Sequence, residues 1–273
     1  MLIILLINLR FLRFFAKEST VLEIVQAGQA GKTKLLFDMH RMRKRVFKDR
    51  MGWDVHVTEG GLEVDQFDLD DTVYLLALND SRQVIGNWRL LPTTGSTMVR
   101  DVWPQFLDTL PMPCSPDVWE SSRFAVDSPA ANSEEGLAQV NRATRELFVG
   151  LTELCLLCGI KQIYTFYDMR IARLLKRIDC PPSAISARLK IEDFHAEVGI
   201  FDTDEVMLQR LRAASGITET LVTLDMLPPV LQHYRARLKN LPRTQYETAA
   251  EVQHWTEMAL VPDIRPTPQH AVG

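Results

Sequence analysis

A strand-like stretch near the middle of the chain limits most strongly what this protein can be. Residues 118–127 read VWESSRFAVD, and their β-branched and aromatic residues are typical of a strand buried in a sheet. Glu120 and Arg123 interrupt this pattern, and burying such charges is unfavourable unless they are paired or line a wet cleft. Two interpretations follow: a structural ion pair or a reaction centre.

Composition limits the broad class of protein. The chain has 273 residues, of which 46% are hydrophobic and 24% charged, which is typical of a soluble globular protein. Its net charge of -4 argues against a nucleic-acid partner. Four cysteines are too few for a disulfide framework in a chain of this length, so we expect a cytoplasmic location.

The two ends of the chain differ in character from the rest. Residues 1–15 are almost wholly apolar, but a spanning helix needs about 20 residues. No signal-peptide pattern is clear. We expect an N-terminal extension over 1–20 and no integral membrane segment. One domain is expected over 21–240, followed by a C-terminal extension over 241–273 that forms a helix and then a loose tail.

A glycine loop near the start of the domain suggests an alternative function. Residues 27–33, AGQAGKT, follow a strand-like run and precede a helix, which is the layout of a phosphate loop. Gln26 stands where the first glycine of that motif is required. A nucleotide-binding module therefore stays open as an alternative. A non-enzymatic, membrane-associated interaction protein, attached through residues 1–15, is another.

The following helix and loop carry residues suited to a cationic ligand. Arg43 and Phe47 are four residues apart and share a helix face, and Trp53 follows a turn. An aromatic wall beside polar anchors can hold a cation or an adenine, although ordinary packing also explains it. Residues 63–71 contain five acids. They form a solvated turn, a counter-charge for a cationic ligand or, least favoured because the calcium-loop spacing is absent, a metal site.

The order of elements predicts the fold class. Strands are expected at 72–78 and 84–91, with Arg89 inside the second, and a long helix at 137–158. Further strands and helices follow, including a helix at 169–178 with a basic face at 170–177. This order predicts a single α/β (α+β) domain with a mixed, mostly antiparallel sheet flanked by helices.

Five features occur together in the order and approximate spacing of the acyl-homoserine-lactone (autoinducer) synthases, which the chain resembles from about 21 to about 238. They are Arg43-x-x-x-Phe47, Trp53, Glu63-x-Asp65-x-x-Asp68, RLLPTT from Arg89, and WE-x-SRF from Trp119. The resemblance implies an acyltransferase (GNAT)-like fold that splays two central strands to admit a pantetheine arm. The pyrophosphate loop of that fold, R-x-x-G-x-G/A, does not follow Val126. We therefore expect another way of holding the acyl donor.

The resemblance also implies the reaction. The amine of S-adenosylmethionine attacks an acyl thioester and forms an amide. The methionyl carboxylate then displaces the sulfonium, closes the lactone and releases methylthioadenosine. The product is a quorum-sensing signal, and no cofactor or metal is expected beyond the two substrates.

Residue roles follow from the same resemblance. Glu120 is the expected general base, with a pKa raised by partial burial, and Ser122 or backbone N–H groups are expected to bind the oxyanion. Arg123 completes the catalytic set. The expected S-adenosylmethionine-binding residues are Arg43, Phe47, Trp53, Asp65, Asp68 and Arg89. Among these, the two aspartates would hold the cationic groups, Arg43 or Arg123 the carboxylate, and Arg89 and Arg123 would also brace the acidic cluster.

The acyl donor is expected to be an acyl-CoA rather than an acyl carrier protein. The expected acyl pocket consists of Phe124, Phe148, Phe166 and Tyr167. The Phe166-Tyr167 pair resembles the branch of the family that uses CoA esters of aryl or branched acids. The basic face at 170–177 would suit either CoA phosphates or an acidic carrier protein.

Overall fold

The computed structural model describes residues 20–127, 134–191 and 194–240. Apart from Thr20, the expected extensions over 1–20 and 241–273 lie outside the described residues. The described chain forms an eight-stranded sheet in the order β1-β2-β3-β4-β5-β8-β6, and β7 also pairs with β8. The strands are β1 Val21–Gln26, β2 Val73–Leu78, β3 Val84–Pro92, β4 Val118–Val126, β5 Gln162–Asp168, β6 Ala184–Ile185, β7 Leu189–Ile191 and β8 Phe194–Asp202.

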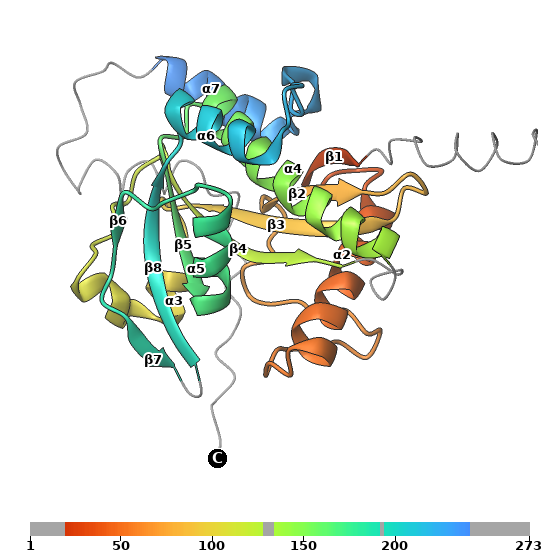
Figure 1. The fold of residues 1–273 in the computed structure, drawn as a ribbon, viewed down its shortest axis with the longest axis horizontal. Helices are drawn as coiled ribbons and strands as arrows, with labels where there is room; N and C mark the ends of the chain where they lie inside the picture. The colour runs from red at the N-terminus through yellow and green to blue at the C-terminus, as the bar shows by residue number, and fades with distance from the viewer. Residues whose placement is uncertain (1–19, 128–133, 192–193, 241–273) are drawn as a thin grey trace, which may run out of the picture.

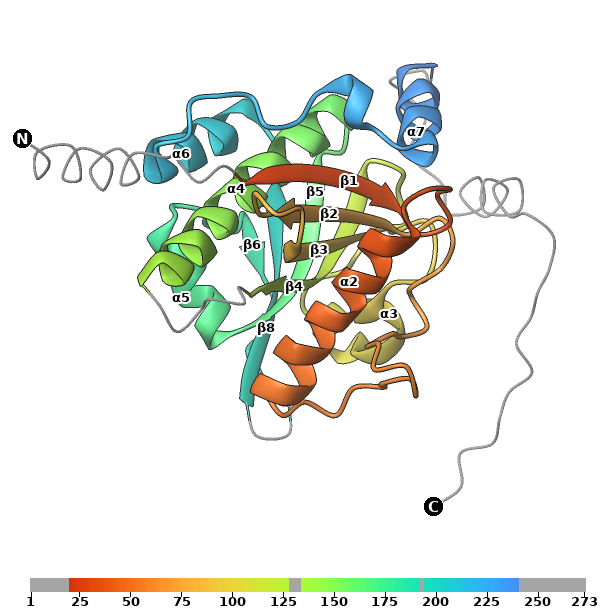
Figure 2. The same cartoon turned by 90° about the vertical axis from the view of Figure 1, so that its right-hand side faces the viewer.

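Helices cover both faces of this sheet (Figures 1 and 2). One face carries α4, α5, α6 and α7, whose apolar residues share one core with the strands. The other carries α2, which packs on β2 and β3, and α3 with its following 3₁₀ turn, which packs on β5 and β8. The helices are α2 Thr33–Lys44, α3 Met98–Val102, α4 Glu134–Cys158, α5 Met169–Arg177, α6 Glu205–Ser215 and α7 Pro229–Asn240, with 3₁₀ turns at Pro104–Asp108 and Leu224–Met226. The predicted single domain with a mixed sheet between helices is confirmed.

The long helix α4 forms because its apolar residues recur at helical spacing. Ala143, Leu147, Leu151 and Leu154 recur every three or four residues and are all buried against the sheet. Cys155 and Cys158 lie in the same core, as expected for small packing residues.

The centre of the sheet opens between β4 and β5. These two strands are parallel, whereas every other pair in the described sheet is antiparallel. Their pairing runs from Val118 opposite Gln162 to Ser121 opposite Thr165, whose hydroxyl groups lie 2.7 Å apart. Both strands continue beyond this point, so they separate as the expected acyltransferase architecture requires.

A β-bulge lies in β4 just past this point. The register with β3 shifts between Asn87 and Arg89. Arg123 has a φ angle of 55°, in the left-handed region that residues other than glycine rarely adopt. The Asn87 side-chain amide donates to the Arg123 carbonyl at 2.8 Å and holds the bulge. As a result, Ser122 and Arg123, although adjacent, both reach partners on the α2 face: Arg89 and Glu63.

Two expectations near the start of the domain need correction. The α-helix expected to reach Phe47 ends at Lys44 and continues as a π-helical turn, Arg45–Arg50. Several amides of the glycine loop before α2, and the lysine that would reach a phosphate, already have partners. The Ala27 and Gly28 N–H groups donate to carbonyls of residues 72 and 70, at 2.9 and 2.8 Å, and Lys32 pairs with Glu23 at 2.8 Å. The nucleotide-binding alternative therefore has no structural support.

Within the described residues, none of the helices combines the length and apolarity that crossing a membrane demands.

Candidate active site

Three arginines and three carboxylates form a closed ring on the α2 face of the sheet. Each arginine pairs with two acids and each acid with two arginines, in the order Arg43–Glu63–Arg123–Asp65–Arg89–Asp68 and back to Arg43. We call this set the charged ring. It joins α2, the 63–68 loop, β3 and β4, segments far apart in the sequence, and its formal charges cancel.

The geometry of the charged ring is tight. Arg43 donates to both oxygens of Asp68, at 2.8 and 3.0 Å, and its Nε donates to Glu63. Arg123 lies 3.1 Å from Glu63 and 2.7 Å from Asp65, and Arg89 lies 3.0 Å from Asp68. Such bidentate, charge-assisted bonds offset the cost of burying the ions.

Acidities in the charged ring reflect this pairing. Burial acts to raise the pKa of Asp68, but the Arg43 and Arg89 guanidinium groups prevail and hold that pKa well below its usual range. The pKa of Asp65 is lowered in the same way, against burial, by Arg89 and then Arg123. Both aspartates are therefore ionised whenever the fold is intact at neutral pH.

The charged ring changes the interpretation of several predicted residues. Arg43 is wholly buried and pairs with both Glu63 and Asp68, whereas a role in binding S-adenosylmethionine stays a prediction. Arg123 is 13% exposed, which makes it the accessible one of the two arginines considered for a carboxylate. Asp65 Oδ2 is a buried atom that pairs with Arg123 at 2.7 Å, and the Asp65 side chain as a whole is 16% exposed.

An aromatic wall adjoins the charged ring. The rings of Phe47 and Trp53 stack with centroids 5.3 Å apart and planes 10° apart. Arg123 lies over the Phe47 ring at 5.7 Å, and Trp53 stacks in turn on Phe194 of β8 at 6.4 Å. The π-helical turn after α2 carries Phe47 to this position, and such turns are common at functional sites. The structure thus brings Phe47 and Trp53 together beside the charged ring, as predicted.

Glu120 is a buried acid next to the charged ring but outside it. Its carboxylate accepts hydrogen bonds from the Met98 and Val99 N–H groups, at 3.0 and 2.8 Å, at the start of α3. Burial raises the pKa of Glu120 to about 7, although these two bonds act in the opposite direction. Met98 also places its sulfur 3.3 Å from the Arg123 guanidinium, so Met98 contacts both groups. Ser122, two residues along β4, accepts from Arg89 at 3.0 Å.

Three residues of this region were not assigned roles from the sequence. Glu63 occurs in the motif but was not singled out, although it connects Arg43 to Arg123. Tyr74 donates its hydroxyl to Asp68 at 2.6 Å, and Met98 bridges as described. The signal for Tyr74 was available in the sequence, because the predicted β2–β3 hairpin can pair it with Arg89, as the register shows.

The residues expected to form the acyl pocket divide between the two faces. Phe124 and Phe148 lie 5.5 Å apart on the α4 face, where Tyr167 packs on Phe201 in the same core. Phe166 stacks instead on Trp103 at 4.1 Å, in the cluster on the opposite face. Adjacent strand residues point to opposite faces, so Phe166 and Tyr167 cannot line one wall. The expectation of a pocket shared by all four residues was therefore wrong.

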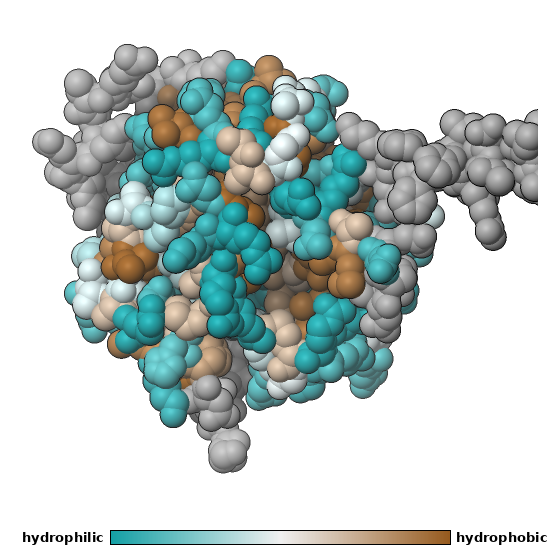
Figure 3. All heavy atoms as spheres, viewed as in Figure 1, coloured by the Kyte–Doolittle hydropathy of each residue, from teal (hydrophilic) through white to brown (hydrophobic). Residues whose placement is uncertain are grey.

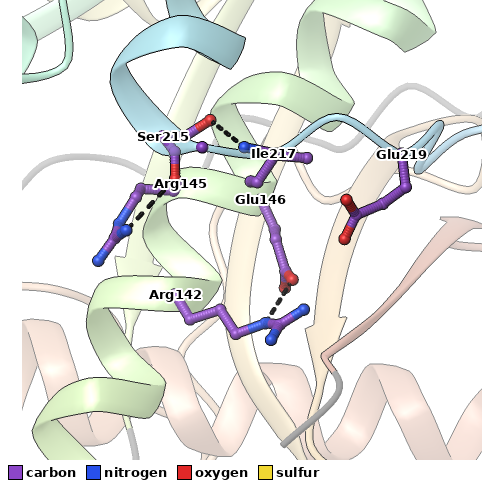
Figure 4. A pocket seen from close by; sticks show the side chains of 7 residues that line it. Arg142, Arg145, Glu146, Ser215, Ile217 and Glu219 are labelled. Carbon is purple, nitrogen blue, oxygen red and sulfur yellow. Dashed lines mark hydrogen bonds and ion pairs between the residues drawn. The ribbon is translucent and has the colours of Figure 1, made fainter. Parts of the chain in front are cut away.

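Two polar surface features complete the description. Hydrophilic side chains gather over the face that α5 occupies (Figure 3), and its arginine at 170 is 57% exposed and pairs with Asp168. Between α4 and the end of α6 lies a polar pocket in which Arg142 bonds Glu146 at 2.6 Å and Arg145 bonds the Ser215 carbonyl at 3.4 Å (Figure 4). This pocket shares no residue with the charged ring.

Comparison with known proteins places these features in a family context. The family model described as autoinducer synthase matches residues 28–211. The chain is 34% identical over 203 residues to a probable acyl-homoserine-lactone synthase of Sinorhizobium fredii (strain NGR234), covering 74% of this chain and 97% of the relative. It is 35% identical over 172 residues to the acyl-homoserine-lactone synthase of Pseudomonas aeruginosa, covering 62% and 83% of the two chains.

Solved structures of acyl-homoserine-lactone synthases are also similar to this chain. The crystal structure of the acyl-homoserine-lactone synthase LasI superposes with a TM-score of 0.62 at 29% identity, over 74% of this chain and all of that one. A CoA-dependent acyl-homoserine-lactone synthase, BjaI, gives 0.65 at 23% identity, over 80% of this chain and 100% of BjaI. At that identity the likeness to BjaI is one of fold.

Proposed function

The chain belongs to the autoinducer synthase family and is an acyl-homoserine-lactone synthase. We propose that its two substrates bind on opposite faces of the sheet. S-adenosylmethionine binds on the α2 face, against the charged ring, and the acyl group lies on the α4 face. The two meet where β4 and β5 separate. The observation that carries this proposal is the placement of the charged ring and Glu120 on one side of that opening, with Phe124 and Phe148 on the other.

The substrate's charges determine how it binds. Its sulfonium and adenosine lie against the Phe47–Trp53 wall, since an aromatic face attracts a cation. Its carboxylate pairs with Arg123, and its amine donates to the carboxylate of Asp65, since these are the two partly exposed side chains of the charged ring, at 13% and 16%. The remaining members of the charged ring fix these two groups in advance, so little reorganisation accompanies binding.

Glu120 acts as the general base of amide formation. The ammonium of S-adenosylmethionine is not nucleophilic until it loses a proton, and a base with a pKa of about 7 suits that transfer at neutral pH. The freed amine attacks the thioester carbonyl carbon, and the carbon–sulfur bond then breaks. The nitrogen loses its second proton as the amide forms, and the leaving thiolate takes up a proton and departs as the thiol. The Ser122 hydroxyl or a backbone N–H of β4 stabilises the oxyanion between the attack and the breaking of the carbon–sulfur bond.

Lactone closure needs no further base. The methionyl carboxylate attacks the carbon bonded to the sulfonium, that carbon–sulfur bond breaks, and neutral methylthioadenosine leaves. Both reacting groups belong to one molecule, so holding the carboxylate close to the carbon supplies most of the acceleration. Arg123 serves this step by orienting the carboxylate.

Acyl-CoA is the proposed donor, in preference to an acyl carrier protein. Supporting this, BjaI and MesI, two proteins of the same fold, are described as CoA-dependent, and BjaI was solved with isopentyl-CoA. The basic residues of α5 offer partners for CoA phosphates. We place the reaction in the cytoplasm, consistent with free cysteines at all four positions.

Product analysis tests the proposal. Purified protein, S-adenosylmethionine and a series of straight, branched and aryl acyl-CoA thioesters should give an acyl-homoserine lactone and methylthioadenosine in equal amounts by mass spectrometry. The same acyl groups on a carrier protein form the comparison. Failure to form lactone from any thioester would refute the function, and turnover restricted to carrier-protein donors would refute only the choice of CoA.

A further inference from the structure

One indole N–H on the α4 face has no hydrogen-bond partner. Trp88, on β3, packs its ring against Phe124 and Phe148, with centroids 4.8 and 4.6 Å away. Its side chain is only 4% exposed, and its Nε1 finds no acceptor among the residues that the structure describes. Buried Trp119, by contrast, donates its Nε1–H to the Pro116 carbonyl at 3.1 Å.

An unpartnered indole N–H in such a place is unusual. Buried tryptophans normally satisfy this donor, and leaving it unpaired is unfavourable. The neighbouring phenyl rings offer only their faces, which are weak acceptors compared with an oxygen atom. An oxygen brought by a ligand would therefore gain a hydrogen bond without having to displace an existing partner.

The position of Trp88 in the fold indicates which ligand could bring that oxygen. Trp88 is the β3 residue passed over where the register with β4 shifts, opposite the bulge at Arg123. Its neighbour Arg89 points to the other face, into the charged ring. Trp88 therefore lies on the α4 face, where the acyl group is proposed to bind, and directly next in sequence to a member of the charged ring on the opposite face. An acyl chain packed against Phe124 and Phe148 lies within reach of this indole.

We propose that Trp88 Nε1–H donates a hydrogen bond to an oxygen on the acyl group beyond the thioester, an oxo or hydroxyl substituent. The enzyme then selects oxygen-bearing acyl donors over hydrocarbon chains of equal length. This inference rests on the proposed function and specifies its substrate class. A plain chain leaves the indole unpaired, and a site built around a buried donor discriminates against a ligand that cannot pair with it.

The test compares matched donors and matched variants. The ratio of kcat/KM is measured for 3-oxo or 3-hydroxy acyl-CoA against the plain acyl-CoA of the same chain length. We expect this ratio to be about tenfold in the native enzyme, which corresponds to one hydrogen bond. Trp88→Phe should bring it to about one by slowing the oxygen-bearing donor, because phenylalanine has no N–H group to donate. Phe148→Leu, which alters the same cluster without touching the indole N–H, should keep the ratio.

Two results would overturn the inference. They are a ratio near one in the native enzyme, and a ratio left unchanged in Trp88→Phe, whether or not that variant loses activity equally toward both donors. A native ratio near one overturns the inference whether or not Trp88→Phe folds. Lactone formation at equal rates from both donors contradicts this inference alone, whereas no lactone from either donor contradicts the proposed function itself.

Discussion

At the scale of single residues, the burial of Glu120 sets the pH response of the enzyme. Burial raises the pKa of this acid to about 7, and only its carboxylate form can accept a proton. We therefore predict that kcat/KM for S-adenosylmethionine, which reports the ionisation of the free enzyme, rises with pH through about 7 and then levels off. A profile that is flat from about pH 6 to about pH 8 would show that Glu120 is not the group that titrates.

Glu63 illustrates how far the charged ring depends on each member. Replacing it with alanine leaves Arg43, which is wholly buried, without one of its two acids, and Arg123 likewise. Breaking a buried pair in this way costs about 3–5 kcal/mol. We predict a loss of that size in the free energy of unfolding by urea. Glu59→Ala, at an exposed position of the same loop, is the control and should change stability by less than about 0.5 kcal/mol.

At the scale of elements, the bulge in β4 decides which residues meet. Without it, Ser122 and Arg123 would point to opposite faces, and the charged ring could not close. The bulge depends on the bond between the Asn87 amide and the Arg123 carbonyl.

We predict that Asn87→Ala folds but loses about tenfold in kcat/KM for S-adenosylmethionine, because one hydrogen bond that orients Arg123 is gone. Steady-state kinetics measures the loss. Asn79→Ala, in the β2–β3 hairpin, removes a comparable local bond to Gln83 and should leave the kinetics unchanged. Equal kinetics for native enzyme and Asn87→Ala would mean that the bulge does not need this bond.

The bulge in β4 is a feature that could not be predicted from the sequence. Most strands and helices follow from apolar periodicity, and the charged residues inside strands indicated the site because buried charges need partners. The residue types around Arg123 do not indicate a positive φ angle at this position. The pairing of each arginine with its acids could therefore not be predicted. The separation of Phe166 from Tyr167, in contrast, follows from strand alternation alone and could have been foreseen.

At the scale of the whole molecule, the sheet separates the two substrates. The Phe47–Trp53 wall and the charged ring lie on the α2 face, and Phe124 and Phe148 lie on the α4 face. Changes on one face should therefore leave recognition on the other unchanged, since sites without shared contacts behave additively.

We predict a double dissociation between the faces. Trp53→Ala should raise the KM for S-adenosylmethionine about tenfold, the size of a lost cation–π contact, without changing the order of preferred acyl donors. Phe148→Leu should change the preferred length or branching of the acyl chain and leave the KM for S-adenosylmethionine within about twofold. Steady-state kinetics with several acyl-CoA thioesters measures both quantities. If either variant altered both substrates equally, the separation by face would be wrong.

The account rests on Glu120 removing the proton from the bound amine, and one comparison tests this directly. Turnover of native enzyme and Glu120→Gln is followed by mass spectrometry of lactone and methylthioadenosine, while calorimetry measures S-adenosylmethionine binding. The account predicts unchanged binding and a loss of about 100-fold or more in kcat, the usual contribution of a general base. A Glu120→Gln enzyme that turns over at the native rate would contradict it.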